Sequence, residues 1–157
     1  MFREMRRRKQ ALSLESCVEV LRKGTSGVLA VSGDDGYPYA VPLSYVYDDG
    51  RLFFHCAPSG HKLDAIAGNE KASFCVIDQD HVVPEEYTTY YRSVIAFGRA
   101  RVLEDEGEKR AALEKLAERY SPRQEEGRRA EIDKLFQRVC MVELAVEHMS
   151  GKEAIEL

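Results

Sequence analysis

Short turn sequences divide the first half of the chain into strands, and they constrain its fold more than any other feature. Gly33-Asp34-Asp35-Gly36 and Asp48-Asp49-Gly50 combine glycine with aspartate, the residues that tolerate the backbone of tight hairpin turns. The segments beside them are therefore predicted to be consecutive antiparallel strands, over 27–31, 37–47 and 51–56. Such a meander needs closure or a covering layer, because its edge strands otherwise expose unpaired backbone groups.

Further strands extend this sheet along the chain. Residues 71–78 alternate with both faces mostly apolar, which indicates a strand covered on both sides. Residues 79–88, which contain Pro84, are predicted to be a polar loop. Residues 90–103 are predicted to be a long strand bent at Gly98, and a last strand is expected over 139–146. About six or seven mostly antiparallel strands favour a mainly β (α+β) fold, an antiparallel barrel with peripheral helices.

Helical segments are recognised by their apolar spacing and by the residues that bound them. Ser13 is a predicted N-cap for the first helix, Gly24 its C-terminal stop, and Pro122 lies just beyond the longest helix. We predict helices over 14–24, 61–67, 104–120 and 130–137, with a charged linker at 123–129.

Composition limits the classes of partner. A chain of 157 residues suits a single domain, here 1–157, and its net charge of -4 argues against nucleic acid as the main partner. The basic run near the N-terminus predicts a flexible arm over 1–12, or alternatively a tether for an anionic ligand or a partner subunit. No secretory or membrane-spanning segment is recognised, so a cytoplasmic protein with no membrane partner is expected.

The cysteines and histidines form no metal-binding or catalytic motif in the sequence. The four cysteines are far apart and make no C-x-x-C pair, so each is interpreted as a small buried hydrophobe. Structural zinc and disulfides are disfavoured on this spacing and in a reducing compartment. The histidines are scattered, and the motifs of hydrolases, zinc proteases and P-loop enzymes are missing. No metal site is predicted.

A phosphate site is predicted where a strand ends and a short helix begins. The first amides of a helix are unpaired, and the helix dipole places its positive end at the same point. The helix start adds a hydroxyl, a glycine and basic side chains, from Ser59, Gly60, His61 and Lys62. The alternative is that Ser59 merely caps the helix and Lys62 is a surface lysine.

Two residues outside this helix start could also contact a ligand. His55, at the end of the preceding strand, is either a hydrogen-bonded core residue or a ligand contact. Arg92 interrupts an apolar and aromatic strand, and a buried arginine needs an anionic partner. A phosphate or a carboxylate would serve, and the alternative is an intramolecular salt bridge to one of the abundant acids, such as Asp64 or Glu86.

Three segments, 39–47, 52–63 and 91–100, resemble in order and spacing the pyridoxamine-phosphate-oxidase-like flavoproteins. More narrowly they resemble the nitroimidazole-resistance (Nim-like) branch, whose end is similar to residues 147–153. The similarity extends from about Leu14 to Glu153. It implies a homodimeric split β-barrel that binds FMN in a cleft between the subunits.

The resemblance also implies roles for individual residues. His55 matches a histidine associated with the reactive site and is the candidate catalytic residue. The segment 149–152 is expected to reach the flavin of the partner subunit. The cofactor-binding residues carried over for the ring edge are Val41, Pro42, Leu43 and Ser44; for the flavin, His55, Cys56 and Ala57; for the phosphate, Ser59, Gly60, His61 and Lys62; and for the phosphate and ribityl chain, Tyr91, Arg92 and Ser93.

The function implied is an FMN-dependent oxidoreductase that reduces a small organic substrate such as a nitroaromatic compound. One alternative is a non-catalytic protein that stores or senses FMN or haem, with a histidine on the iron. Others are a structural or interaction module with an empty cleft, or a protein that binds a deazaflavin. Pyridoxamine phosphate oxidation itself is not expected, because 147–157 lacks the arginine-rich substrate motif.

Overall fold

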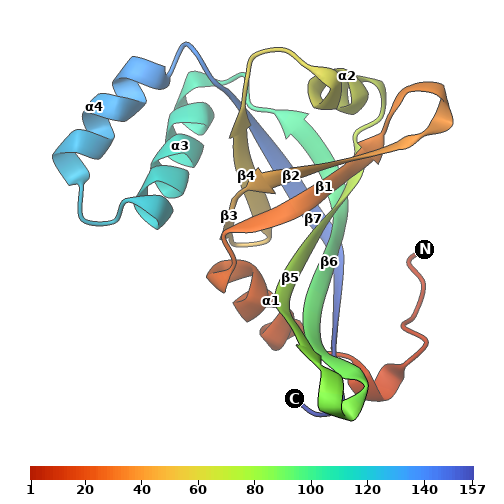
Figure 1. Cartoon of the computed structure of the whole chain (residues 1–157). Helices are drawn as coiled ribbons and strands as arrows, with labels where there is room; N and C mark the ends of the chain where they lie inside the picture. The colour runs from red at the N-terminus through yellow and green to blue at the C-terminus, as the bar shows by residue number, and fades with distance from the viewer.

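The computed structural model describes residues 1–157 as one seven-stranded antiparallel sheet in the order β2-β1-β5-β6-β7-β4-β3 (Figure 1). The two ends of the sheet approach each other where β2 contacts β4, which gives an incompletely closed barrel. This confirms the predicted mainly β split barrel with peripheral helices. The strands are β1 (Ser26–Ser32), β2 (Pro38–Ser44), β3 (Val46–Asp48), β4 (Arg51–Cys56), β5 (Lys71–Val83), β6 (Thr88–Val102) and β7 (Cys140–Glu153).

Four α-helices lie around this sheet. Ser13 Oγ accepts a hydrogen bond from the Ser16 amide and begins the first helix, and Asp105 does the same for the third through the Glu108 amide. The third and fourth helices form a hairpin on one side of the barrel (Figure 1). None of the helices has the length and apolar character needed to cross a membrane. Their bounds are α1 (Leu14–Lys23), α2 (His61–Gly68), α3 (Glu106–Tyr120) and α4 (Glu125–Leu135).

Two hydrophobic clusters hold these elements together. The larger lies between α1 and the inner sheet face, where Leu21, Phe54 and Phe74 are fully buried. The smaller lies between the α3–α4 hairpin and the outer face of β4 and β7, around Phe53 and Met141. Full burial of each such side chain contributes about 1.5–3 kcal/mol, so the hairpin is a structural part of the barrel wall.

The predicted strand over 37–47 is wrong in one respect, because Tyr45 divides it into two strands. β2 and β3 lie at opposite ends of the sheet order, and Tyr45 turns its ring into the core between them. Its hydroxyl donates to the Leu21 carbonyl at 2.7 Å, and the Tyr120 hydroxyl donates to the Tyr45 carbonyl at 2.8 Å. The second of these bonds satisfies the Tyr45 carbonyl at the break, so the alternating sequence continues while the chain passes from one end of the sheet to the other.

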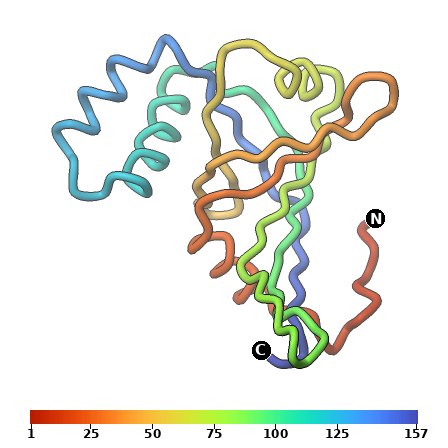
Figure 2. The backbone as a smooth tube through the Cα atoms, in the orientation of Figure 1, coloured from red at the N-terminus to blue at the C-terminus, as the bar shows by residue number.

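The polar loop predicted over 79–88 is also wrong. β5 continues to Val83, and β6 begins at Thr88 after a short turn at Pro84. The paired strands form a long projecting hairpin beside β7, which itself extends past residue 146 to Glu153 (Figure 2). Polar side chains suit both faces of a projecting hairpin, so composition alone resembled a loop.

The start of α4 and the close strand contact at Gly98 also bear on the sequence predictions. The charged linker predicted at 123–129 instead contains the first turns of α4, which buries Ile132 and leaves its charges in solvent. The bend predicted at Gly98 coincides with a register shift between β6 and β7, where Glu147 has no partner residue. A Cβ atom at Gly98 would lie 2.0 Å from the Ala145 carbonyl oxygen, so only glycine allows this close approach.

Residues 1–12 run along the projecting strands. The ring of Phe2 stacks on His148 with centroids 4.7 Å apart, and Gln10 Nε2 donates to the Tyr91 hydroxyl at 3.1 Å. The segment therefore has defined contacts within the chain, and its flexibility remains a prediction.

Candidate functional site

The start of α2 is open to a ligand. Gly60 occupies the N-cap position with φ 148°, a conformation that favours glycine, and no side chain accepts a hydrogen bond from the first-turn amides. Ser59 therefore does not cap the helix, and the capping alternative for this residue is wrong. Apart from Gly60 and its two chain neighbours, no residue has an atom within 4 Å of the position that a Gly60 Cβ would occupy. Free amides and open space thus coincide at the positive end of the helix dipole.

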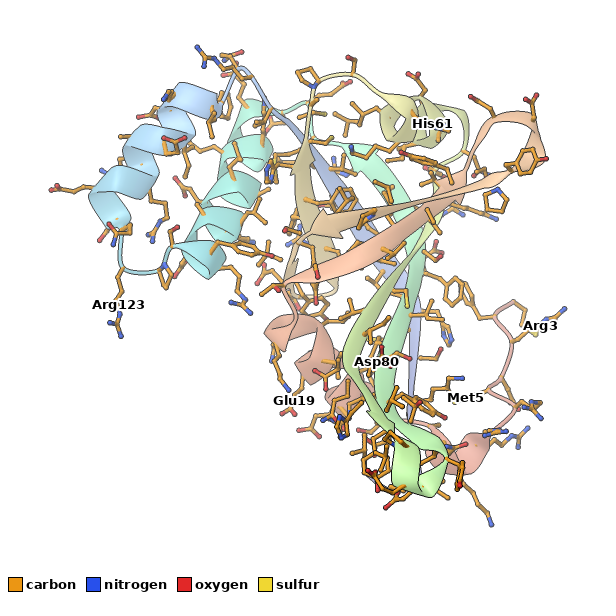
Figure 3. The ribbon with its side chains drawn as sticks, viewed as in Figure 1. Arg3, Met5, Glu19, His61, Asp80 and Arg123 are labelled. Atoms are coloured by element: carbon orange, nitrogen blue, oxygen red, sulfur yellow. The ribbon has the colours of Figure 1, made fainter.

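Two basic residues in the first turn of α2 have different surroundings. Lys62 is half-buried and makes no salt bridge. His61 stacks on Tyr39 with centroids 4.0 Å apart, and its Nε2 lies 3.8 Å from Asp34 Oδ2 (Figure 3). The imidazole of His61 therefore faces the β1–β2 turn, while the Lys62 ammonium is available to an anion.

His55 lines a cavity of about 500 Å³ between the strands and the α3–α4 hairpin. His55 lies two residues after Phe53, so both side chains project from the same face of β4. The α3–α4 hairpin buries Phe53 but leaves His55 exposed. Ser44, Arg128 and Glu131 add polar groups to the lining. The apolar wall consists of Leu113, Leu116, Ala117, Ile132, Leu135 and Val139. His55 is thus a surface residue of a cavity and not a core histidine.

The helical half of this cavity was missed by the sequence interpretation. Tyr120, Gln124, Arg128 and Glu131 come from α3, α4 and their connection. No motif marks these residues, because they meet His55 only when the hairpin packs against the barrel. The signal that could have found them is the apolar face of α3, which needed a surface to cover.

β2 is an edge strand of the sheet, so one side of its backbone has no partner strand. The side chains of Val41 and Leu43 pack against the inner core cluster, and Pro42 and Ser44 face outward. Proline is tolerated at such an edge because the N–H group it lacks is not needed there. This arrangement leaves backbone groups of residues 41–44 accessible, as the predicted ring-edge contacts require.

Arg92 already has carboxylate partners in the chain. Its Nη1 lies 3.0 Å from Asp78 Oδ2, and its Nε lies 2.7 Å from Glu153 Oε2. Hydrogen bonds to Glu153 and Asp78 raise the pKa of Arg92, so it is fully charged. The intramolecular salt bridge is thus present, and its partners are Asp78 and Glu153 in place of the suggested Asp64 or Glu86.

One chain brings some of the predicted site residues together and leaves the others apart. The β2 edge, the end of β4 and the start of α2 lie at one end of the molecule. Tyr91 pairs with Asp80, which lies at the opposite end from His61 in Figure 3. The Ala100 amide donates to the Glu70 carbonyl, which lies just after the C-terminal end of α2. From Ala100 to Arg92 the strand spans roughly 26 Å, at about 3.3 Å per residue. Residues 91–93 therefore cannot contact an anion at α2 of the same chain.

A family model described as pyridoxamine 5'-phosphate oxidase matches residues 13–153. The chain belongs to this family. The resemblance inferred from the three sequence segments is thereby confirmed. No curated protein matches the chain in sequence.

Solved structures share the family's fold with this chain. A candidate 5-nitroimidazole antibiotic resistance protein from Bacteroides thetaiotaomicron is 21% identical, with a TM-score of 0.78 over 91% of this chain and 86% of its own. An FAD-binding protein from Mesorhizobium loti is 27% identical, with a TM-score of 0.68 over 92% and 97%. An FAD and heme binding protein from Mycobacterium smegmatis is 25% identical, with a TM-score of 0.77 over 94% and 74%.

Proposed function

We propose that this protein binds FMN as a homodimer and uses it to reduce a small organic molecule. The observation that supports this most directly is the uncapped start of α2 with the unpaired Lys62 beside it, in a chain of the pyridoxamine 5'-phosphate oxidase family. A phosphate dianion suits this site, because it accepts hydrogen bonds from free amides and is neutralised by an ammonium group.

The residues around the helix start fit the rest of a flavin mononucleotide. Ser59 and the amides that follow Gly60 would hold the phosphate together with Lys62, and the β2 edge from Val41 to Ser44 would contact the ring through its backbone. The bound flavin would supply hydride or electron transfer. The protein would orient the ring, exclude water and select the second substrate.

A second copy of the chain is supported by the outer face of the sheet. Pro42, Val28, Cys75 and Ile95 are adjacent in register across four strands, and this row has no covering layer. Antiparallel sheets that face water usually carry polar residues on that side. An apolar row therefore favours burial against a partner subunit. A partner is also the only source from which residues 91–93 could reach the phosphate.

The cavity beside His55 suits the substrate. A volume of about 500 Å³ lies within the roughly 300–1,000 Å³ of small-molecule sites, and its mainly apolar lining favours a flat organic compound. The fold shared with the candidate 5-nitroimidazole resistance protein makes nitroaromatic compounds the first class to test. His55, at the rim, would contact the substrate and provide a proton donor or acceptor.

The test is an absorbance spectrum of the purified protein, with mass spectrometry of whatever is released on denaturation. FMN is the expected product, in a protein that elutes as a dimer. Release of FAD, which relatives from Mesorhizobium loti and Mycobacterium smegmatis bind, would replace FMN in the proposal, whereas release of haem without flavin would favour the haem-binding alternative and refute it. A protein that neither contains nor takes up any flavin would refute it.

The reductase activity is tested separately, on chemically reduced protein without oxygen. Addition of a nitroimidazole should restore the oxidised flavin spectrum. His55→Ala should slow this step while FMN affinity changes little, and His81→Ala, on the projecting hairpin, is the matched control. Equal rates for both variants would remove His55 from the proposed chemistry.

A further inference from the structure

Two cysteines that are far apart in the sequence lie directly opposite each other in the sheet. Cys56 is the last residue of β4 and Cys140 the first residue of β7, and the antiparallel register of these strands pairs them. Their side chains therefore project from the same face. Both are free thiols. Burial and the adjacent Cys140 raise the pKa of the Cys56 thiol to about 11, while nearby Lys62 opposes the shift.

This pairing satisfies the main requirement for a disulfide. Directly opposed residues of antiparallel strands have Cα atoms about 4.5–5.5 Å apart, and disulfides usually join Cα atoms about 4.4–6.8 Å apart. The other two cysteines lack such an arrangement. Cys75 is opposite Val28 and Ile95, and Cys17 lies on α1. The four cysteines are far apart in the sequence, but the strand register brings Cys56 and Cys140 together.

We propose that Cys56 and Cys140 are a reversible redox pair, which peroxide converts to an intrachain disulfide between β4 and β7. The half-buried Cys140 is the more accessible sulfur, since Cys56 is only 8% exposed. The Cys140 thiolate attacks the peroxide O–O bond, which gives a sulfenic acid and releases water after protonation. The Cys56 sulfur then forms the S–S bond as the S–O bond breaks, with loss of a second water. Two thiols have then lost two electrons and two protons to one peroxide.

The bond would connect the two parts of the chain that border the candidate site. The residues that precede the two cysteines, His55 and Val139, both line the cavity. Beyond Cys56 the chain continues directly to the open start of α2. A cross-link here fixes the end of β4 against the beginning of β7, so the oxidation state would control how far the cavity wall and the helix start can move. This inference rests on the strand register and holds whether or not a flavin is bound.

The experiment is oxidation of the protein, as purified, by hydrogen peroxide. The remaining thiols are alkylated and the digested protein is mapped by mass spectrometry without reduction. We expect a linked peptide pair that contains Cys56 and Cys140, loss of two of the four thiols, and full recovery with dithiothreitol. Because burial keeps Cys56 in its thiol form, bond formation should accelerate as the pH is raised.

Variants separate this pair from general thiol oxidation. The double variant Cys17→Ser/Cys75→Ser should form the disulfide as the wild type does, whereas Cys140→Ser should form no intrachain bond. Circular dichroism verifies the fold of each variant, and the wild-type peptide map stands even if a variant does not fold. The proposal is overturned if Cys56 is still a free thiol that can be alkylated after oxidation, or if the disulfides join separate chains. It is also overturned if Cys140 is oxidised to sulfinic acid without forming a disulfide.

Discussion

Replacement of Lys62 by alanine tests the proposed phosphate site at α2. Lys62 is half-buried, lies in the first turn of the helix and has no acidic partner, so its charge is available to an anion. A hydrogen bond that involves a charged group is worth about 1.5–3 kcal/mol, which corresponds to about a tenfold to 100-fold change in the dissociation constant. Partial exposure lets water screen the charge, so we expect a loss near the lower limit, about tenfold, that decreases as salt is added.

The assay is titration of the cofactor-free protein with FMN and with riboflavin, which has the same ring and no phosphate. Lys62→Ala should weaken FMN binding and leave riboflavin binding unchanged. Lys134→Ala, which removes an exposed lysine from α4, should change neither. An FMN affinity within twofold of the wild type would refute the assignment. Equal weakening for both ligands would show that the substitution disturbs the fold instead of a phosphate contact.

Further substitutions test the packing and the electrostatics of the fold. Gly98→Ala places a Cβ 2.0 Å from the Ala145 oxygen and should lower the free energy of unfolding by about 1–3 kcal/mol in urea titrations. Gly127→Ala, inside α4 and in open space, should raise the free energy of unfolding by about 0.4–1 kcal/mol. The same sign for both variants would contradict the close approach at Gly98. The hydrogen bond from Lys115 lowers the pKa of Asp48 below 3.8, so the pair stabilises the protein above that pH and loses its effect as the pH falls through the lowered pKa. Asp48→Asn should therefore cost about 0.2–1 kcal/mol at neutral pH and nothing well below pH 3.8, and a cost that persists in acid would exclude the ion pair as its cause.

Local signals in the sequence were sufficient wherever one short segment determines its own structure. Ser13 caps α1 and the glycine and aspartate turns join consecutive strands, as predicted, and the bend predicted at Gly98 coincides with a register shift. The open start of α2 was also recognisable, because a strand end followed by Pro58, Ser59 and Gly60 cannot continue as a strand. These features depend on backbone conformations and caps that a few adjacent residues decide.

The errors occurred where distant segments compete for the same residue. Tyr45 breaks an alternating pattern where its hydroxyl donates to the Leu21 carbonyl and its carbonyl accepts from the Tyr120 hydroxyl. Arg92 resembled an unpaired cation because its partners, Asp78 and Glu153, lie on two other strands. Neither contact leaves a trace in the residues next to it, so no window of the sequence could reveal it.

The sequence alone determined the class of this protein, an antiparallel split barrel, and its family, and it indicated the helix start at which we propose a phosphate site. Those properties follow from turns, caps and ordered motifs that are local in the chain. Only the tertiary structure decided that the α3–α4 hairpin builds a cavity over His55, that residues 91–93 lie too far from α2 to share a ligand within one chain, and that Cys56 faces Cys140. The physical reason is that register and packing join residues through space, and burial of the two hydrophobic clusters fixes which residues meet.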